Sequence, residues 1–182
     1  MSCSARDGAL LATASASATV RVFDNRTGRE LNRLANPGPS AVPAAENAVR
    51  SMAFSPDGLL SATGTDDETP RVFETRPGRE LSRVTLPEKS EPELIAVSRD
   101  RMMMGVRLEK GRSLIYGVRS GREVLQTEFH NYLSSIRFDT RSTLVTLVSH
   151  FDRSWRTFDI RSGREPHYRL DYFEVPSNRA GS

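Results

Sequence analysis

The chain has 182 residues, a length that suits one domain or part of one. Hydrophobic residues make up 37% of it, which is enough to bury a core and argues against a wholly disordered protein. The net charge of +3 is mild, and all but Lys89 and Lys110 of the 26 basic residues are arginines. This surplus does not by itself indicate a nucleic-acid partner, which calls for clustered basic residues among aromatic platforms.

The terminal and cysteine patterns bear on the cellular compartment. Cys3 is the only cysteine, so no internal disulfide can form and nothing points to an oxidising environment. The first residues lack the basic region and apolar run of a signal peptide. No stretch approaches the ~20 apolar residues that cross a bilayer. We expect a soluble, cytoplasmic protein with no membrane partner.

A five-residue pattern, Arg-x-Gly-Arg-Glu, occurs four times and divides the chain into repeats. It covers residues 26–30, 76–80, 119–123 and 161–165. The spacings of 50, 43 and 42 residues lie near the roughly 40–45 residues of a four-stranded propeller blade. Residues 1–34 align without a gap with 51–84, and residues 95–124 align likewise with 52–81.

The second repeat shows the predicted elements of one unit, strands a to d. They are strand a (50–55), a Pro56-Asp57-Gly58 turn, strand b (59–65), a solvated Asp66-Asp67-Glu68 turn, strand c (69–74), a c–d turn and strand d (80–86). The c–d turns carry Gly28, Gly78, Gly121 and Gly163, where a left-handed residue is expected.

In chain order we expect a single repeat domain. Its parts are repeat 1 (1–34), a Pro/Ala-rich insert (35–49), repeat 2 (50–86), a loop (87–93), repeat 3 (94–128), repeat 4 (129–175) and a frayed tail (176–182). The last strand d is expected near residues 167–175.

The segments LLATASASATVRVFDNRTGREL and AFSPDGLLSATGTDDETPRVFETRPGREL resemble the WD-repeat family of β-propellers. The resemblance implies an all-β fold, a β-propeller of about four four-stranded antiparallel blades that form an open arc or part of a larger ring. Such rings serve many unrelated functions, so the fold alone does not name a ligand.

The chain departs from the family at several repeat positions. The family's Trp at the end of strand c is replaced by an aromatic ring without the indole donor, at Phe23, Phe73, Tyr116 and Phe158. The family's b–c turn Asp remains as Asp67 and Asp152, and His130 alone offers the His of its buried polar network. Because most of these networks are incomplete, we expect stability to rest mainly on apolar packing. Trp155 lies off the family's Trp position and is expected to pack between blades.

The number of repeats raises the question of closure. Propellers close with roughly four to eight blades, and an open arc exposes one apolar face at each end. The chain is then a fragment of a longer propeller, which we favour, or two copies associate to close a ring, or four blades close alone.

We expect no catalytic, cofactor-binding or metal-binding residue. The sequence has no Gly-x-Ser-x-Gly nucleophile elbow and no phosphate-cradling glycine loop, and its three histidines show no metal-ligand spacing. Cys3 is expected as a small buried hydrophobe, and Met102-Met103-Met104 as core and inter-blade packing.

The repeated c–d turns predict one candidate partner-binding surface, which we call the arginine rim. It comprises Arg26, Arg29, Arg76, Arg79, Arg119, Arg122, Arg161 and Arg164. Stacked along one face, these side chains suit an acidic or phosphorylated partner. The structural alternative is that Glu30, Glu80, Glu123 and Glu165 neutralise them, and that small charged turns simply suit the position.

The function that follows is a non-catalytic protein–protein interaction scaffold or ligand-sensing module with an unidentified protein partner. Two alternatives for the partner remain, a second copy of the chain and the remainder of a propeller. The alternative is the propeller portion of a larger enzyme or signalling NTPase or kinase, contributing regulation rather than catalysis. Nucleic-acid binding would show a steep loss of affinity with salt.

Overall fold

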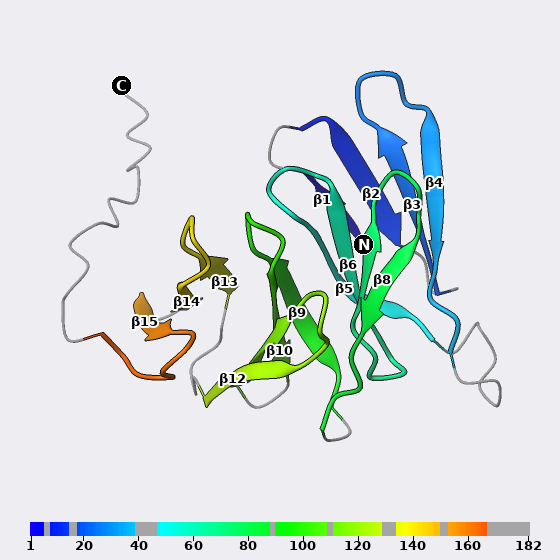
Figure 1. The fold of residues 1–182 in the computed structure, drawn as a ribbon. Coiled ribbons are helices and arrows are strands. Elements are labelled where there is room, and N and C mark those ends of the chain that lie inside the picture. Colours follow the sequence, from blue (N-terminus) through cyan, green and yellow to red (C-terminus); the bar gives the residue numbers. More distant parts are fainter. Residues whose placement is uncertain are drawn as a thin grey trace, which may run out of the picture.

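The computed structural model describes residues 1–5, 8–14, 18–38, 47–87, 90–108, 111–128, 134–149 and 153–166. Within these ranges the chain forms strands and turns and no α-helix. The strands group into four antiparallel sheets that follow one another in chain order (Figure 1).

The four sheets contain fifteen described strands. The first sheet has β1 (Ser2–Ser4), β2 (Leu10–Ala14), β3 (Thr19–Asp24) and β4 (Glu30–Ala35). The second has β5 (Val49–Phe54), β6 (Leu60–Thr65), β7 (Arg71–Glu74) and β8 (Glu80–Arg83). The third has β9 (Pro92–Val97), β10 (Met103–Leu108), β11 (Arg112–Gly117) and β12 (Glu123–Glu128). The fourth has β13 (Ser135–Phe138), β14 (Leu144–Ser149) and β15 (Ser154–Asp159).

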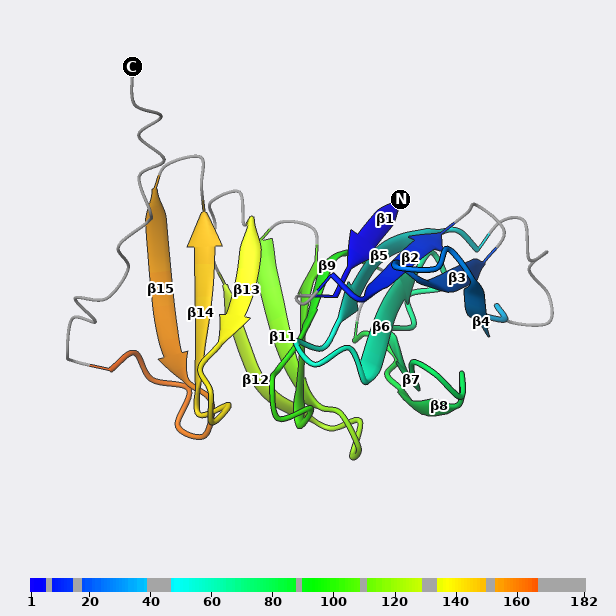
Figure 2. The same cartoon turned by 90° about the horizontal axis from the view of Figure 1, so that it is seen from above.

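Each sheet is a meander whose strands pair in sequence order. Consecutive strands therefore run in opposite directions, and the a–b turn and the c–d turn of a sheet lie at the same edge. In Figure 2 the arrows of β13 and β15 point to one edge while β14 points to the other. The predicted all-β class and antiparallel four-stranded unit are confirmed. The fourth strand expected near residues 167–175 lies outside the described residues.

The second repeat differs from its prediction at two strand ends. The third strand was expected from Thr69 but begins at Arg71, because Pro70 has no N–H to give to the ladder. The fourth strand was expected to reach Leu86 but ends at Arg83. Single backbone hydrogen bonds continue beyond it, from Val84 N–H to the Pro70 carbonyl at 2.9 Å.

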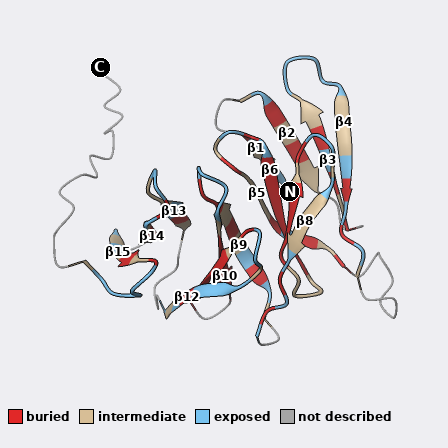
Figure 3. Cartoon of the chain, in the orientation of Figure 1, coloured by how far each residue is buried: buried red, intermediate tan, exposed pale blue. Residues whose placement is uncertain are grey.

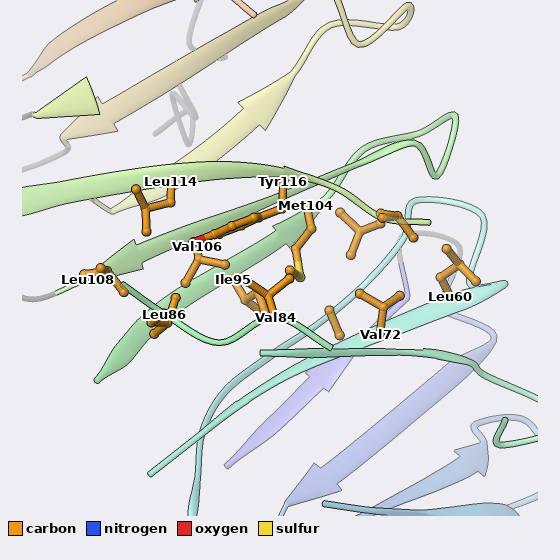
Figure 4. Packing of buried hydrophobic residues seen from close by; sticks show 13 residues of the cluster. Leu60, Val72, Val84, Leu86, Ile95, Met104, Val106, Leu108, Leu114 and Tyr116 are labelled. Atoms are coloured by element: carbon orange, nitrogen blue, oxygen red, sulfur yellow. The ribbon is translucent and has the colours of Figure 1, made fainter. Parts of the chain in front are cut away.

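Apolar side chains lie between consecutive sheets, because alternate residues of each strand point to opposite faces. Val20, Val22 and Leu34 of the first sheet pack with Phe73 of the second. Figure 4 shows the next core, in which Val72 and Val84 of the second sheet meet residues of the third sheet such as Tyr116. Burying each large side chain stabilises the fold by about 1.5–3 kcal/mol.

The third and fourth sheets share a third apolar core. Ile115 and Leu125 of the third sheet pack with Ile136, Leu147 and Phe158 of the fourth. Exposed residues gather in the turns and on outer strands such as β12, whereas middle strands such as β6 and β10 are largely buried (Figure 3). Each sheet is thus held mainly by its two neighbours, as in other repeat architectures.

The innermost strands of successive sheets lie against one another, with β1 beside β5, β5 beside β9 and β9 beside β13. The sheets follow each other along a curve and do not close into a ring (Figure 2). The architecture agrees with the prediction of an open arc or part of a larger ring, and in the described part of the chain each end sheet has one face without a neighbouring sheet.

Candidate partner-binding face

The c–d turns are tight hairpin turns that hold their arginines outside the sheets. In the first, Asp24 N–H donates to the Arg29 carbonyl at 2.9 Å and Gly28 N–H donates to the Asp24 carbonyl at 2.8 Å. Gly28 adopts a φ of +69°, a left-handed conformation that glycine takes without a Cβ clash. The expected left-handed glycine is also found at Gly78 (+70°), Gly121 (+61°) and Gly163 (+69°).

All eight arginines of the arginine rim are exposed: Arg26, Arg29, Arg76, Arg79, Arg119, Arg122, Arg161 and Arg164. The turn sequence produces this exposure. The two rim arginines of each turn stand two residues before and one residue after the left-handed glycine, outside the strands, so neither side chain points into a sheet core. The exposure of these side chains therefore has a local cause, the closing hydrogen bonds of the turn.

Carboxylates at the base of two turns are occupied by the turn itself. Asp24 Oδ1 accepts the Thr27 N–H and hydroxyl, both at 2.9 Å, and Asp159 Oδ1 accepts the Ser162 N–H at 2.7 Å and hydroxyl at 2.8 Å. These backbone and side-chain hydrogen bonds hold the pKa of both carboxyls below the ordinary value. Both groups are thus ionised turn caps.

The repeat glutamates form ion pairs with arginines on the strands and not with arginines of the turns. The pairs are Glu30 with Arg33, Glu80 with Arg83 (2.6 Å) and Glu165 with Arg156 (2.5 Å). Glu30 and Glu80 are the first residues of β4 and β8, and Glu165 follows the last described c–d turn. Among the described residues these three glutamates therefore form their ion pairs with strand arginines and none with the arginine rim.

One rim arginine is paired, with a different glutamate: Arg79 Nη2 lies 2.8 Å from Glu74 Oε1. Within the described ranges, the other seven form no ion pair; they are Arg26, Arg29, Arg76, Arg119, Arg122, Arg161 and Arg164. Their side chains are exposed, and Arg26 and Arg161 interact electrostatically with the turn carboxylates of Asp24 and Asp159.

A groove of about 530 Å³ lies between the turns of the second and third sheets. Its lining includes Arg76 and Arg119, which come from successive c–d turns. Two exposed apolar side chains, Leu59 at 49% and Met102 at 52%, also line it. The groove thus combines two guanidinium groups that form no ion pair among the described residues with exposed apolar surface.

The two carboxylates that line the groove are already engaged. Glu74 forms the ion pair with Arg79, and Asp100 Oδ1 accepts the Ser142 hydroxyl at 2.6 Å and the Met102 N–H at 3.0 Å. Burial disfavours the charged form of Asp100, but these bonds outweigh it and keep its pKa below the ordinary value. Glu74 is thus neutralised by Arg79, whereas Asp100 stays ionised; among the described residues neither forms an ion pair with Arg76 or Arg119.

Neighbouring turns also contact one another, which makes the face continuous. Arg101 of the third sheet lies 3.5 Å from the Asp57 carboxylate of the second, and Asn32 of the first sheet donates to the Arg76 carbonyl at 3.0 Å. A Cβ on Gly78 would lie 2.2 Å from the Asn32 amide nitrogen, so only glycine allows this approach.

The aromatic residue at the end of strand c packs against the preceding sheet. Phe73, Tyr116 and Phe158 are 2%, 3% and 5% exposed, and burial raises the pKa of Tyr116 to about 12. Phe23 is only half-buried, because no described sheet precedes the first one. Trp155 is 53% exposed on the last sheet, so the prediction that it packs between blades is wrong for the described residues.

A family model described as "WD domain, G-beta repeat" matches residues 40–74, which end on strand β7. The match covers less than half of the chain, and the four antiparallel sheets built from internally aligned repeats are consistent with a partial WD-repeat propeller. WD repeats generally serve as scaffolds for protein interactions. No curated protein matches the chain.

The second blade contains a buried polar network, of which only Asp67 was expected from the sequence. The side chains of Arg71 and Asp67 are each 3% exposed, and Arg71 Nη2 lies 2.7 Å from Asp67 Oδ2. Arg71 also donates to the Thr65 hydroxyl at 3.1 Å and to the Pro37 carbonyl at 2.8 Å. The Asp66-Asp67-Glu68 turn was predicted as solvated, and at Asp67 that prediction is wrong.

The charge on Asp67 is kept by its hydrogen bonds. Burial alone would raise the pKa of this carboxyl, but hydrogen bonds from Arg71 and Thr65 hold it below the ordinary value. An arginine on strand c thus supplies hydrogen bonds to the turn carboxylate and to the Thr65 hydroxyl. The expectation that blades rest mainly on apolar packing does not describe this one.

Two buried asparagines extend the network to the neighbouring blade. Asn47 accepts the Asp67 N–H at 2.9 Å and donates to the Asn36 carbonyl at 2.9 Å, and Asn36 Oδ1 accepts the Thr63 hydroxyl at 2.6 Å. Both belong to the long connection between blades 1 and 2, where the sequence pattern does not distinguish them from other loop residues. The remaining network residues, His130 and Asp152, lie outside the described residues.

Other candidate chemistry is sparse. Cys3 is a free, partly buried thiol beside the first core, and burial raises its pKa to about 11. Met104 is buried, but Met102 precedes β10 in the a–b turn and is exposed, so its predicted core position is wrong. Among the described residues, no cluster of three potential metal ligands occurs, and no helix has the length and apolar character to span a membrane.

Proposed function

We propose that the chain is a non-catalytic interaction scaffold that binds an acidic or phosphorylated protein segment on the arginine rim. The observation that carries the proposal is the charge state of this face. Seven exposed guanidinium groups have no ion-pair partner in the described part of the chain, whereas the strand arginines Arg33, Arg83 and Arg156 do.

The chemistry of the guanidinium group supports an anionic partner. Its planar fork donates two parallel hydrogen bonds to one carboxylate or phosphate, and such charge-assisted bonds are stronger than neutral ones. A row of like charges also attracts an acidic segment at a distance, an effect that salt weakens. The face therefore favours acidic segments over neutral ones.

The groove suggests how the segment is anchored. Leu59 and Met102 expose apolar surface between Arg76 and Arg119. Binding energy at interfaces concentrates where an apolar side chain fills a desolvated pocket among polar contacts. We therefore propose a partner segment with an apolar residue flanked by Asp, Glu or phosphorylated residues. A cytoplasmic location is part of this proposal and is supported by the unpaired thiol of Cys3.

A matched pair of double variants tests the proposal. The first, Arg76→Gln with Arg119→Gln, removes two charges at the groove; the control, Arg33→Gln with Arg83→Gln, removes two charges from exposed strand arginines. The probe is a fluorescent synthetic peptide of Asp and Glu with one central Leu, titrated at low salt and followed by anisotropy. A neutral peptide of Gln with the same Leu, and a single-stranded oligonucleotide, complete the set.

We expect the groove variant to lose about tenfold or more in peptide affinity, because a hydrogen bond to a charged group contributes about 1.5 kcal/mol or more. The control variant should bind nearly as wild type does. Equal losses in the two variants would show a general charge effect and end the proposal. Tighter binding of the oligonucleotide than of the acidic peptide would equally contradict it.

A further inference from the structure

A third arginine lines the groove between the second and third sheets. Besides Arg76 and Arg119, which belong to the arginine rim, the lining includes Arg101 of the a–b turn of the third sheet. The three guanidinium groups therefore come from three different turns. All the lining residues belong to the second and third sheets and their turns, so the groove is formed by these two sheets alone.

Arg101 occupies a backbone position that does not favour arginine. Its φ is +63°, and the gapless alignment places it at Gly58, whose φ is +69°. The two turns are closed alike, because Arg101 N–H donates to the Ser98 carbonyl at 3.0 Å and Gly58 N–H donates to the Ser55 carbonyl at 2.8 Å. Glycine adopts this conformation without a Cβ clash, whereas arginine adopts it at a free-energy cost. Such costs concentrate at functional sites, and the turn itself does not explain the arginine.

The ion pair of Arg101 does not explain the arginine either. Its guanidinium group lies 3.5 Å from the Asp57 carboxylate, and the two side chains are 45% and 36% exposed. This distance is longer than the 2.8 Å between Arg79 and Glu74. The other oxygen of Asp57 already accepts the Ser55 hydroxyl at 2.6 Å. Because exposed pairs of this kind contribute little to stability, Arg101 can exchange Asp57 for an anion of higher charge.

The groove keeps an excess of positive charge. Of its two carboxylates, Glu74 is neutralised by Arg79, and Asp100 is ionised. Even with the charge of Arg101 set against Asp57, the two rim arginines of the groove outnumber the Asp100 carboxylate. A ligand that enters must also outweigh the repulsion of Asp100. The groove therefore favours an anion that carries more than one negative charge.

We propose that the groove binds a phosphorylated side chain of the partner segment in preference to Asp or Glu, and that Arg101 determines this preference. The inference rests on the proposed function and names the ligand class at the same groove. A phosphoryl group carries about −1.5 to −2 charges at pH 7 and three acceptor oxygens, one for each guanidinium group. A carboxylate carries a single charge and two oxygens. Because Leu59 and Met102 line the same groove, the phosphorylated residue stands beside an apolar one.

Three synthetic peptides test the preference. They share a neutral sequence of Gln with a central Leu, and the residue before the Leu is phosphoserine, Glu or Ser. Binding to the wild-type chain is followed by fluorescence anisotropy at low salt. We expect the phosphoserine peptide to bind about tenfold or more tightly than the Glu peptide, because an additional charge-assisted hydrogen bond contributes about that factor. The Ser peptide should bind most weakly.

Variants of one turn assign the preference to Arg101. Arg101→Gly should remove most of it and change the affinity for the Glu peptide much less. Because glycine suits the left-handed position, this variant should unfold at no lower urea concentration than the wild type. Arg101→Lys keeps the charge without the planar fork and should show an intermediate preference. Arg99→Gln is the matched control, since Arg99 is an exposed arginine of the same turn that does not line the groove, and it should keep the full preference.

Equal affinities of the wild type for the phosphoserine and Glu peptides would overturn this inference and leave an acidic partner of the arginine rim standing. Absence of binding by both peptides would end both proposals. A preference that survives Arg101→Gly would overturn the role of Arg101. Displacement of the phosphoserine peptide by an equal concentration of inorganic phosphate would show a site for the free anion, and tighter binding of a single-stranded oligonucleotide would show a nucleic-acid site; either result would also overturn the inference.

Discussion

Replacing Arg71 by Leu is expected to destabilise the second blade far more than the exposure of Arg21, the residue that aligns with it, would indicate. The guanidinium group is buried and ion-paired with Asp67, and it donates to the Pro37 carbonyl and the Thr65 hydroxyl. The leucine would fill part of the space but leave the Asp67 carboxylate charged and without a counter-ion.

Breaking a buried ion pair by removing one partner costs about 3–5 kcal/mol. Asp67 would keep the Thr65 hydroxyl at 2.5 Å and the Asn47 amide at 3.2 Å, so we expect the lower part of that range, about 3 kcal/mol. Urea unfolding followed by circular dichroism measures the change in the free energy of unfolding.

Two further variants make the reasoning refutable. Arg83→Leu removes an exposed arginine that is ion-paired with Glu80, and its cost should be much smaller because water screens that pair. Adding Asp67→Asn to Arg71→Leu should recover part of the loss, since no unpaired buried charge remains. Equal losses in Arg71→Leu and Arg83→Leu, or no recovery in the double variant, would refute a buried charge pair as the cause.

Three more outcomes follow from the same structure. The folded pKa of Asp67 lies below its ordinary 3.8, so its stabilisation is complete at neutral pH and is lost as the pH falls through the folded pKa; Asp67→Asn should therefore unfold with a weaker pH dependence between about pH 5 and pH 3. Gly28→Ala and Gly78→Ala both force alanine into a left-handed turn at about 1–2 kcal/mol, but Gly78→Ala also meets Asn32 and should lower the unfolding midpoint further. The thiol pKa of Cys3, raised from 9.0 to about 11, means about a hundredfold less thiolate, so alkylation by iodoacetamide should be markedly slower before unfolding than after it.

The repeat organisation was predictable because it depends on local signals. The left-handed c–d glycines, the period-2 strands and the spacing of the repeats are all short-range patterns. The buried role of Arg71 was not predictable, because it depends on the Pro37 carbonyl of the preceding connection and on Asp67 across a turn. Nothing in the local pattern distinguishes it from Arg21, the exposed residue that aligns with it.

The positions of the charged residues in the candidate site were predictable, but their ion pairs were not. The sequence placed Arg79 and Glu80 side by side and suggested mutual neutralisation. In the sheet, adjacent residues point in different directions, so Glu80 pairs with Arg83 while Arg79 pairs with Glu74. The groove was beyond prediction, because Arg76 and Arg119 meet there only through the packing of two blades.

Arginine footprinting tests the binding face most directly. The folded chain is treated with phenylglyoxal in the presence and absence of the acidic peptide, and modified arginines are located by mass spectrometry. We expect the peptide to protect Arg76 and Arg119 and to leave the strand arginines Arg33 and Arg83 unchanged. Protection of the strand arginines, with Arg76 and Arg119 still reactive, would contradict the arginine rim as the partner-binding face.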